Sequence, residues 1–260
     1  MLESREKILE IENVSKEYKE RGLFKKGIKK VLKDVSFSLK KGECLGIVGE
    51  SGSGKSTLGR IITGIEKPTE GKVKFCDEDI HCNRKSDGKD NRMSIVFQNY
   101  TASVNPCFTV ADIIGEPLLI EGKVNKAEIL EKVKELMENV GLPKEFMDRY
   151  PHELSGGQLQ RVCIARAVVI RPEFIMLDEA VSSLDVSTQV EVLDLLKKLK
   201  ETYNLSYIFV SHDLLTITYI CDSVIFFKEG RIVEKIDDIN RLSEIKEEYS
   251  RRLLSAVIEF

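Results

Sequence analysis

A glycine-rich segment that contains a single lysine constrains this chain more than any other feature. Residues 49–57 read Gly-Glu-Ser-Gly-Ser-Gly-Lys-Ser-Thr, which matches the pattern G-x-x-x-x-G-K-[ST]. The apolar run Leu45–Val48 before it is typical of a buried strand, and Leu58–Ile62 after it is typical of a starting helix. A strand, this loop and a helix in that order predict a phosphate-binding loop rather than a Gly/Ser-rich connector with an incidental lysine.

The chemistry of this loop suits a nucleoside triphosphate. Glycines allow backbone N–H groups to turn around phosphate oxygens, and the helix start adds unpaired donors and a partial positive charge. Lys55 can reach the β- and γ-phosphates, and the Ser56 hydroxyl can ligate Mg²⁺. We therefore expect the whole loop to contact the nucleotide: Gly49, Glu50, Ser51, Gly52, Ser53, Gly54, Lys55, Ser56 and Thr57.

Composition excludes several classes of function. The chain has 260 residues, enough for a large core, and a net charge of −3, which gives no general basic field for nucleic acid. Six cysteines without any C-x-x-C pair disfavour a zinc ribbon or a disulfide framework and fit a reducing compartment. No apolar run approaches 18 residues, so we expect no membrane span. The basic run at 25–30 is expected to be a solvated loop, with specific anion or lipid binding as the alternative.

Hydrophobic patterning predicts alternating strands and helices from residue 43 onward, the signature of an α/β fold. Asn125 and Glu128 form a capping-box pattern, and Gly141 and Pro143 should end the helix that follows. Further helices are expected at about 157–169, around 192–199 and from about 240. The expected strands are 9–14, 35–39, 44–48, 72–75, 94–98, 174–177 and 207–210, with a hairpin over 224–234.

Two acidic residues follow the apolar strand at 174–177. Polar residues at the carboxyl ends of parallel strands face the ligand crevice of an α/β sheet. Asp178 can hold Mg²⁺ through water, and Glu179 can polarise the water that attacks the γ-phosphate. A paired surface dipeptide is the alternative interpretation.

A second glycine pair opens a predicted helix. The segment Leu154-Ser-Gly-Gly-Gln158 places Ser155, Gly156, Gly157 and Gln158 at a helix N-terminus, where backbone donors can recognise phosphate. A plain N-cap followed by flexible glycines is the alternative.

With these motifs in this order, the chain resembles the ATP-binding subunits of ABC transporters over nearly its whole length. The resemblance implies an α/β P-loop NTPase with a mixed and mainly parallel core sheet, an N-terminal antiparallel β subdomain and an inserted helical subdomain. It implies one ATP-binding domain over 1–260, with the helical subdomain at 100–165 and a helical tail at 240–260. It further implies that Gln98 contacts Mg²⁺ and water, that Asp185 lies in the D-loop, that His212 contacts the γ-phosphate and that Tyr18 stacks on adenine.

Finer matches resemble the peptide and nickel importer branch of the family. They include Ser103-Val-Asn-Pro106, Arg149-Tyr-Pro-His152 and the segment from Tyr249 to Ala256. The resemblance implies a head-to-tail dimer with a second ATP-binding subunit, either identical or a sister chain, with ATP and Mg²⁺ between them. It implies integral membrane permease subunits, an indirect link to an extracytoplasmic substrate-binding protein, and a peripheral position on the cytoplasmic face of the membrane. An exporter ATPase and a non-transport ABC ATPase are the alternatives.

Overall fold

Two compact units make up the computed structural model, which describes residues 6–21, 26–82, 92–122 and 124–258. The first unit comprises residues 1–86 and 206–260, and the second comprises residues 87–205.

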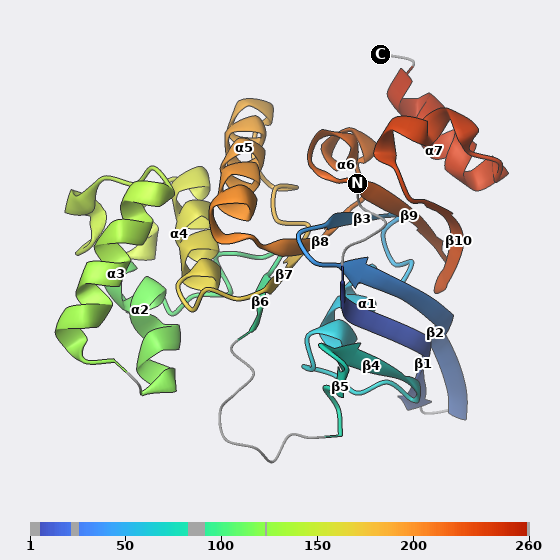
Figure 1. The fold of residues 1–260 in the computed structure, drawn as a ribbon, viewed down its shortest axis with the longest axis horizontal. Coiled ribbons are helices and arrows are strands. Elements are labelled where there is room, and N and C mark those ends of the chain that lie inside the picture. Colours follow the sequence, from blue (N-terminus) through green and yellow to red (C-terminus); the bar gives the residue numbers. More distant parts are fainter. Residues whose placement is uncertain (1–5, 22–25, 83–91, 123, 259–260) are drawn as a thin grey trace. The chain divides into compact units, whose positions relative to one another are not determined.

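An antiparallel sheet forms one part of the first unit (Figure 1). Its strands are β1 (Lys7–Arg21), β2 (Lys26–Lys40), β4 (Glu70–Phe75) and β5 (Glu78–Asp79), in the order β2-β1-β4-β5. The expectation of a solvated loop at 25–30 is wrong for its described part, because residues 26–30 belong to β2; residue 25 lies outside the described residues. Cross-strand pairing with β1 explains why these residues are extended. Glu17 of β1 lies opposite Lys30 of β2, and Nζ of Lys30 is 3.7 Å from the carboxylate of Glu17.

The other strands of this unit carry the phosphate-binding loop. β3 (Cys44–Val48) runs parallel to both β8 (Ser206–Ser211) and β9 (Ser223–Lys228), and β10 (Arg231–Ile236) pairs antiparallel with β9. All residues of β3 and β8 are buried, as expected of strands inside a parallel sheet. The helices are α1 (Lys55–Ile62), α6 (Leu214–Ile220), which contacts β3, and α7 (Glu248–Ile258), which contacts α6 and β10.

The C-terminal helix begins later than the expected residue 240. A 3₁₀ helix spans Ile239–Glu244, and α7 follows it from Glu248. Between them, Ile245 is buried and has a ψ angle of 128°, which breaks the helical path. The break turns the chain before α7 starts.

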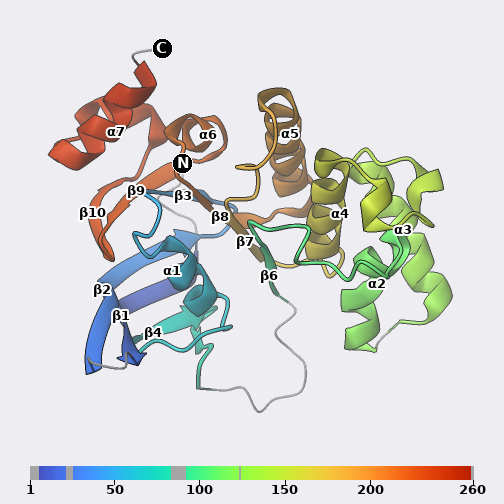
Figure 2. The ribbon, with the colours of Figure 1, turned by 180° about the vertical axis from the view of Figure 1, so that it is seen from behind.

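The second unit joins a strand pair to a group of helices (Figure 2). β6 (Met93–Val96) is parallel to β7 (Phe174–Asp178). The helices are α2 (Val110–Glu121), α3 (Lys126–Asn139), α4 (Gly156–Val168) and α5 (Val186–Tyr203), with short 3₁₀ turns at Lys144–Phe146 and Pro151–Glu153. α4 is the hub, since it contacts α2, α3, α5 and β6. The predicted capping box of Asn125 and Glu128 is confirmed, whereas α2 is absent from the expected elements.

Candidate functional site

The phosphate-binding loop connects β3 to α1, as predicted. β3 ends at Val48 and α1 begins at Lys55. Gly54, which precedes α1, has a φ angle of 109°, a left-handed conformation that would strain any side chain. Gly52 also has a positive φ, and open space surrounds the place where a Cβ would stand. The glycines therefore allow the turns that direct backbone donors around an anion.

Lys55 lies folded across this loop. The residue is only 4 % exposed, and its Nζ donates to the carbonyl oxygens of Gly49 at 2.6 Å and Glu50 at 2.8 Å. Thr57 on the next turn accepts a hydrogen bond from Nη2 of Arg60 at 3.1 Å. The ammonium group is thus held among the loop residues, where a phosphate chain would lie.

An unpaired hydroxyl group is a second reason why the loop suits a polyphosphate. Oγ of Ser53 is buried and has no hydrogen-bond partner among the residues that the structure describes. The backbone carbonyl of Ser53 is fixed by the N–H of Gly230 at 2.8 Å. A buried hydroxyl without a partner is unfavourable, and a phosphate oxygen would satisfy it. The residues present therefore suit a nucleoside triphosphate.

Tyr18 lies on β1 and is held by a cluster of charges. Its hydroxyl donates to Oε1 of Glu66 at 2.7 Å, and Nζ of Lys16 lies 5.3 Å from its ring centroid. Glu66 also pairs with Lys16 at 3.0 Å and Arg60 at 3.2 Å. Burial alone would raise the pKa of Glu66, but hydrogen bonds from Tyr18, Lys16 and Arg60 lower that pKa below its ordinary value. No sequence pattern indicated a role for Glu66.

The acidic pair at the end of β7 meets the glutamine that follows β6. Asp178 is the last residue of β7, and Glu179 follows with a φ angle of 48°, uncommon for a residue with a side chain. Nε2 of Gln98 donates to Oε2 of Glu179 at 2.7 Å. The structure thus brings together two of the three predicted catalytic residues. Since the amide nitrogen is used here, the amide oxygen of Gln98 is the atom suited to a cation.

The glycine pair opens α4 as predicted, and Ser155 is the N-cap. Oγ of Ser155 accepts from the N–H of Gln158 at 3.3 Å, while Oε1 of Gln158 accepts from the N–H of Ser155 at 2.9 Å. This reciprocal capping is the feature that the alternative interpretation expected. It also fixes the exposed helix end, including Gly156, from which backbone donors could meet an anion.

Close packing explains why the residues after Ser155 lack side chains. A Cβ on Gly157 would lie 2.5 Å from Cγ2 of Thr188, and a Cβ on Gly156 would lie 2.7 Å from the hydroxyl oxygen of Tyr100. Real Cβ atoms do not approach other atoms this closely. Sequence reasoning missed both neighbours, because no local pattern connects residues 100, 156 and 188.

Asp185 caps α5 and orients Thr188. Its carboxylate accepts from the N–H of Thr188 at 3.0 Å, from Oγ1 of Thr188 at 2.7 Å and from Oγ of Ser187 at 2.7 Å. These hydrogen bonds, first of all those of Thr188, lower the pKa of Asp185 far below its ordinary value. Asp185 therefore remains a carboxylate, and the methyl group of Thr188 is turned toward Gly157.

His212 follows β8 directly, as predicted, and its side chain is exposed. The next residue, Asp213, caps α6 by accepting from the N–H of Leu215 at 2.9 Å. His212 thus occupies the carboxyl end of a buried parallel strand, the position from which a side chain can meet a ligand.

The predicted Mg²⁺ ligands have suitable chemistry. Ser56, Gln98 and Asp178 offer a hydroxyl, an amide oxygen and a carboxylate, which are hard oxygen ligands of the kind Mg²⁺ prefers.

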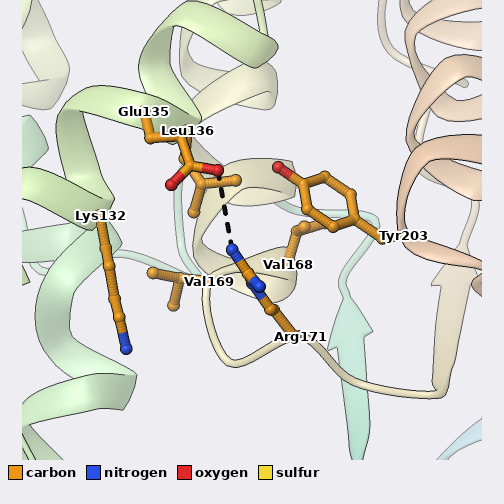
Figure 3. A pocket seen from close by; sticks show the side chains of 7 residues that line it. All are labelled: Lys132, Glu135, Leu136, Val168, Val169, Arg171 and Tyr203. Atoms are coloured by element: carbon orange, nitrogen blue, oxygen red, sulfur yellow. Dashed lines mark ion pairs between the residues drawn. The ribbon is translucent and has the colours of Figure 1, made fainter.

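A pocket in the second unit contains none of the predicted residues (Figure 3). Three of its polar side chains have partners within the unit: Arg171 pairs with Glu135 at 3.7 Å, and the hydroxyl of Tyr203 accepts from Nδ2 of Asn139 at 2.7 Å. Figure 3 shows Arg171, which follows α4, paired with Glu135 of α3, and Tyr203 of α5 nearby. We regard the pocket as part of the helix packing.

Comparison with known proteins agrees with these motifs. A sequence model of a family described as "ABC transporter" matches residues 32–182, more than half of the chain. No helix of the described residues combines the length and the apolar character that crossing a membrane requires.

Sequence similarity to curated proteins extends over nearly the whole chain. The chain is 43 % identical over 254 residues to the metal-staphylopine import system ATP-binding protein CntF of Staphylococcus aureus (97 % of this chain and 100 % of the relative). It is 44 % identical over 257 residues to the oligopeptide transport ATP-binding protein OppF of Bacillus subtilis (97 % and 83 %). Among solved structures, the dimeric bacterial ABC transporter cassette MJ0796 superposes with a TM-score of 0.77 at 31 % identity (88 % and 97 %).

Proposed function

The chain belongs to the ABC transporter family, and from that premise we propose that it is the ATP-hydrolysing subunit of an importer for peptides or metal chelates. The observation that carries this proposal is the loop after β3, where a buried Lys55 crosses a glycine turn that fits a triphosphate. The printed descriptions of the relatives, metal-staphylopine import and oligopeptide transport, support the importer class.

The loop residues 49–57 hold the nucleotide in this proposal. Backbone donors and the ammonium group of Lys55 neutralise the phosphates, and the Ser53 hydroxyl gains an acceptor. Ser56, Asp178 and the amide oxygen of Gln98 would hold Mg²⁺, which would offset the negative charge of the phosphates. The ring of Tyr18 supports adenine while Glu66 fixes its hydroxyl.

Hydrolysis then requires a base near the γ-phosphate. Glu179 accepts a proton from the attacking water, whose oxygen forms the new bond to phosphorus as the bond to ADP breaks. The hydrogen bond from Gln98 orients the Glu179 carboxylate for this step. His212 contacts the γ-phosphate and stabilises its charge.

A second ATP-binding subunit, identical or a sister chain, completes each nucleotide site. The capped helix end at 155–158 and Asp185 of one subunit cover the nucleotide held by the loop of the other, so ATP favours the closed pair. The pair drives membrane permease subunits at the cytoplasmic face of the membrane. A substrate-binding protein outside the membrane selects the cargo and acts on this chain indirectly.

Co-purification and activity together test the proposal. The chain is expressed with the permease and binding-protein genes encoded beside its own, reconstituted into vesicles, and assayed for ATP hydrolysis with and without loaded binding protein. Stimulation by the loaded binding protein, with loss of hydrolysis in Glu179→Gln, supports an importer. A rate of ATP hydrolysis that does not change when loaded binding protein is added indicates an exporter. Co-purification with ribosomes or DNA and no permease overturns the transport assignment.

A further inference from the structure

We propose that Tyr249, on the C-terminal helix α7, is a positioning residue for the phosphate-binding loop. Its hydroxyl accepts a hydrogen bond from the N–H of Glu50 at 3.2 Å and donates to the carbonyl oxygen of Phe227 at 3.5 Å. Residues about 200 positions apart in the chain are thereby connected, one of them inside the loop. The inference rests on the proposed binding of ATP by that loop.

The Tyr249 contact is next to the lysine that meets the phosphates. Tyr249 holds the N–H of Glu50, while the carbonyl oxygen of the same residue accepts from Nζ of Lys55 at 2.8 Å. Glu50 is therefore fixed from both sides, although its own side chain is exposed. Burial raises the pKa of Tyr249, so its hydroxyl keeps the proton that it donates to Phe227.

The position of Tyr249 is itself set by the strands of the first unit. The carboxylate of Glu234, on β10, accepts from the N–H groups of Lys246 at 2.7 Å and Glu247 at 3.3 Å, immediately before α7 begins. Nζ of Lys228, at the end of β9, lies 4.8 Å from the ring centroid of Tyr249. Ser250, the next residue of α7, has no exposed surface. The start of α7 is thus anchored on two strands, and Figure 1 shows α7 beside β10. Tyr249 extends that anchor to the loop.

An anchored loop binds its ligand better than a loose one, because less order must be created on binding. Removal of the Tyr249 hydroxyl leaves the peptide of Glu50 less ordered before ATP arrives. We therefore expect weaker nucleotide binding with little change in the turnover at saturating ATP, since Tyr249 touches neither Glu179 nor any other predicted catalytic residue in the described contacts.

The experiment measures the affinity of the full chain for a fluorescent ATP analogue with Mg²⁺. Tyr249→Phe keeps the ring and removes only the hydroxyl, and we expect its Kd to rise about three- to ten-fold, the range of one net hydrogen bond. Tyr203→Phe is the matched control: it removes a half-buried hydroxyl that bonds Asn139 in the other unit, and its Kd should stay within two-fold of the wild type. A Kd for Tyr249→Phe within two-fold overturns the inference.

A second variant acts without touching the loop. Glu234→Ala releases the start of α7, so it should raise the Kd in the same direction, and adding it to Tyr249→Phe should cause little further loss. Glu244→Ala, which removes a pair with Arg241 instead, is its control. A lower melting temperature with an unchanged Kd in both variants means that α7 only stabilises the fold, which overturns the inference. Wild-type protein that fails to bind the analogue refutes the proposed function instead.

Discussion

The side-chain amide of Gln98 donates a 2.7 Å hydrogen bond to the carboxylate of Glu179, and so connects the segment after β6 to the segment after β7. The two strands are parallel neighbours, and both residues follow their carboxyl ends. A carboxylate held in this way is fixed in direction. The first prediction concerns this pair.

Replacing Glu179 by glutamine removes the proton acceptor but keeps the size of the side chain. We expect ATP hydrolysis to fall by about 10²–10⁴-fold, the usual contribution of a general base, while the affinity for ATP stays within two-fold. Phosphate release and nucleotide titration measure the two effects. Glu145→Gln, on the 3₁₀ turn Lys144–Phe146, serves as the control. Unchanged turnover in Glu179→Gln would show that another group is the base.

Lys55→Ala should impair nucleotide binding itself. A charge-assisted hydrogen bond contributes about 1.5–3 kcal/mol, so we expect the Kd for MgATP to rise by about 10–150-fold. Titration calorimetry checks this value, with Lys126→Ala on α3 as the control. Full affinity in a folded Lys55→Ala protein would place the phosphates away from this loop.

Gly157→Ala should destabilise the fold before any nucleotide is considered, because its new Cβ meets Cγ2 of Thr188. Overpacking of this kind costs about 1–3 kcal/mol. Thr188→Ser in the same chain deletes that methyl group and keeps the hydroxyl that donates to Asp185, so the double variant should regain most of the loss. Chemical denaturation gives both values. A double variant as unstable as the single one contradicts the packing argument.

The Glu66 cluster should give a stability that depends on pH. The hydrogen bonds of Tyr18, Lys16 and Arg60 overcome burial and lower the pKa of Glu66 below its ordinary value of 4.5. The extra stability is therefore fully present above 4.5 and disappears as the pH falls through the lowered pKa. Relative to Glu66→Gln, the wild type should melt higher at pH 7, and the difference should shrink below about pH 4.5. A difference in melting temperature that stays constant as the pH falls would contradict this prediction.

Features that depend on neighbouring residues were predictable from the sequence. The loop between β3 and α1, the Asn125 cap and the hairpin of β9 and β10 all rest on patterns within a few residues. α2 was not predicted as a separate helix because it contains Pro117, and proline usually interrupts helices. The length of β1 and β2 beyond the expected strands was not predicted, because the added residues are polar and are held by cross-strand pairs, which no local pattern reveals.

The supporting side chains of the site could not be predicted for a related reason. Tyr249 meets Glu50 across 199 residues, and Tyr18 meets Glu66 across 48. Such contacts depend on how whole elements pack, so the sequence indicates the residues that meet the nucleotide but not those that hold them in place.

The hydroxyl of Tyr100 fills the space beside Gly156 that a side chain would need. A side chain at position 156 therefore requires Tyr100 to move or to be replaced: a homologue that carries alanine at position 156 should tend to carry a shorter residue at position 100. Covariation between columns 100 and 156 across the family would record that constraint.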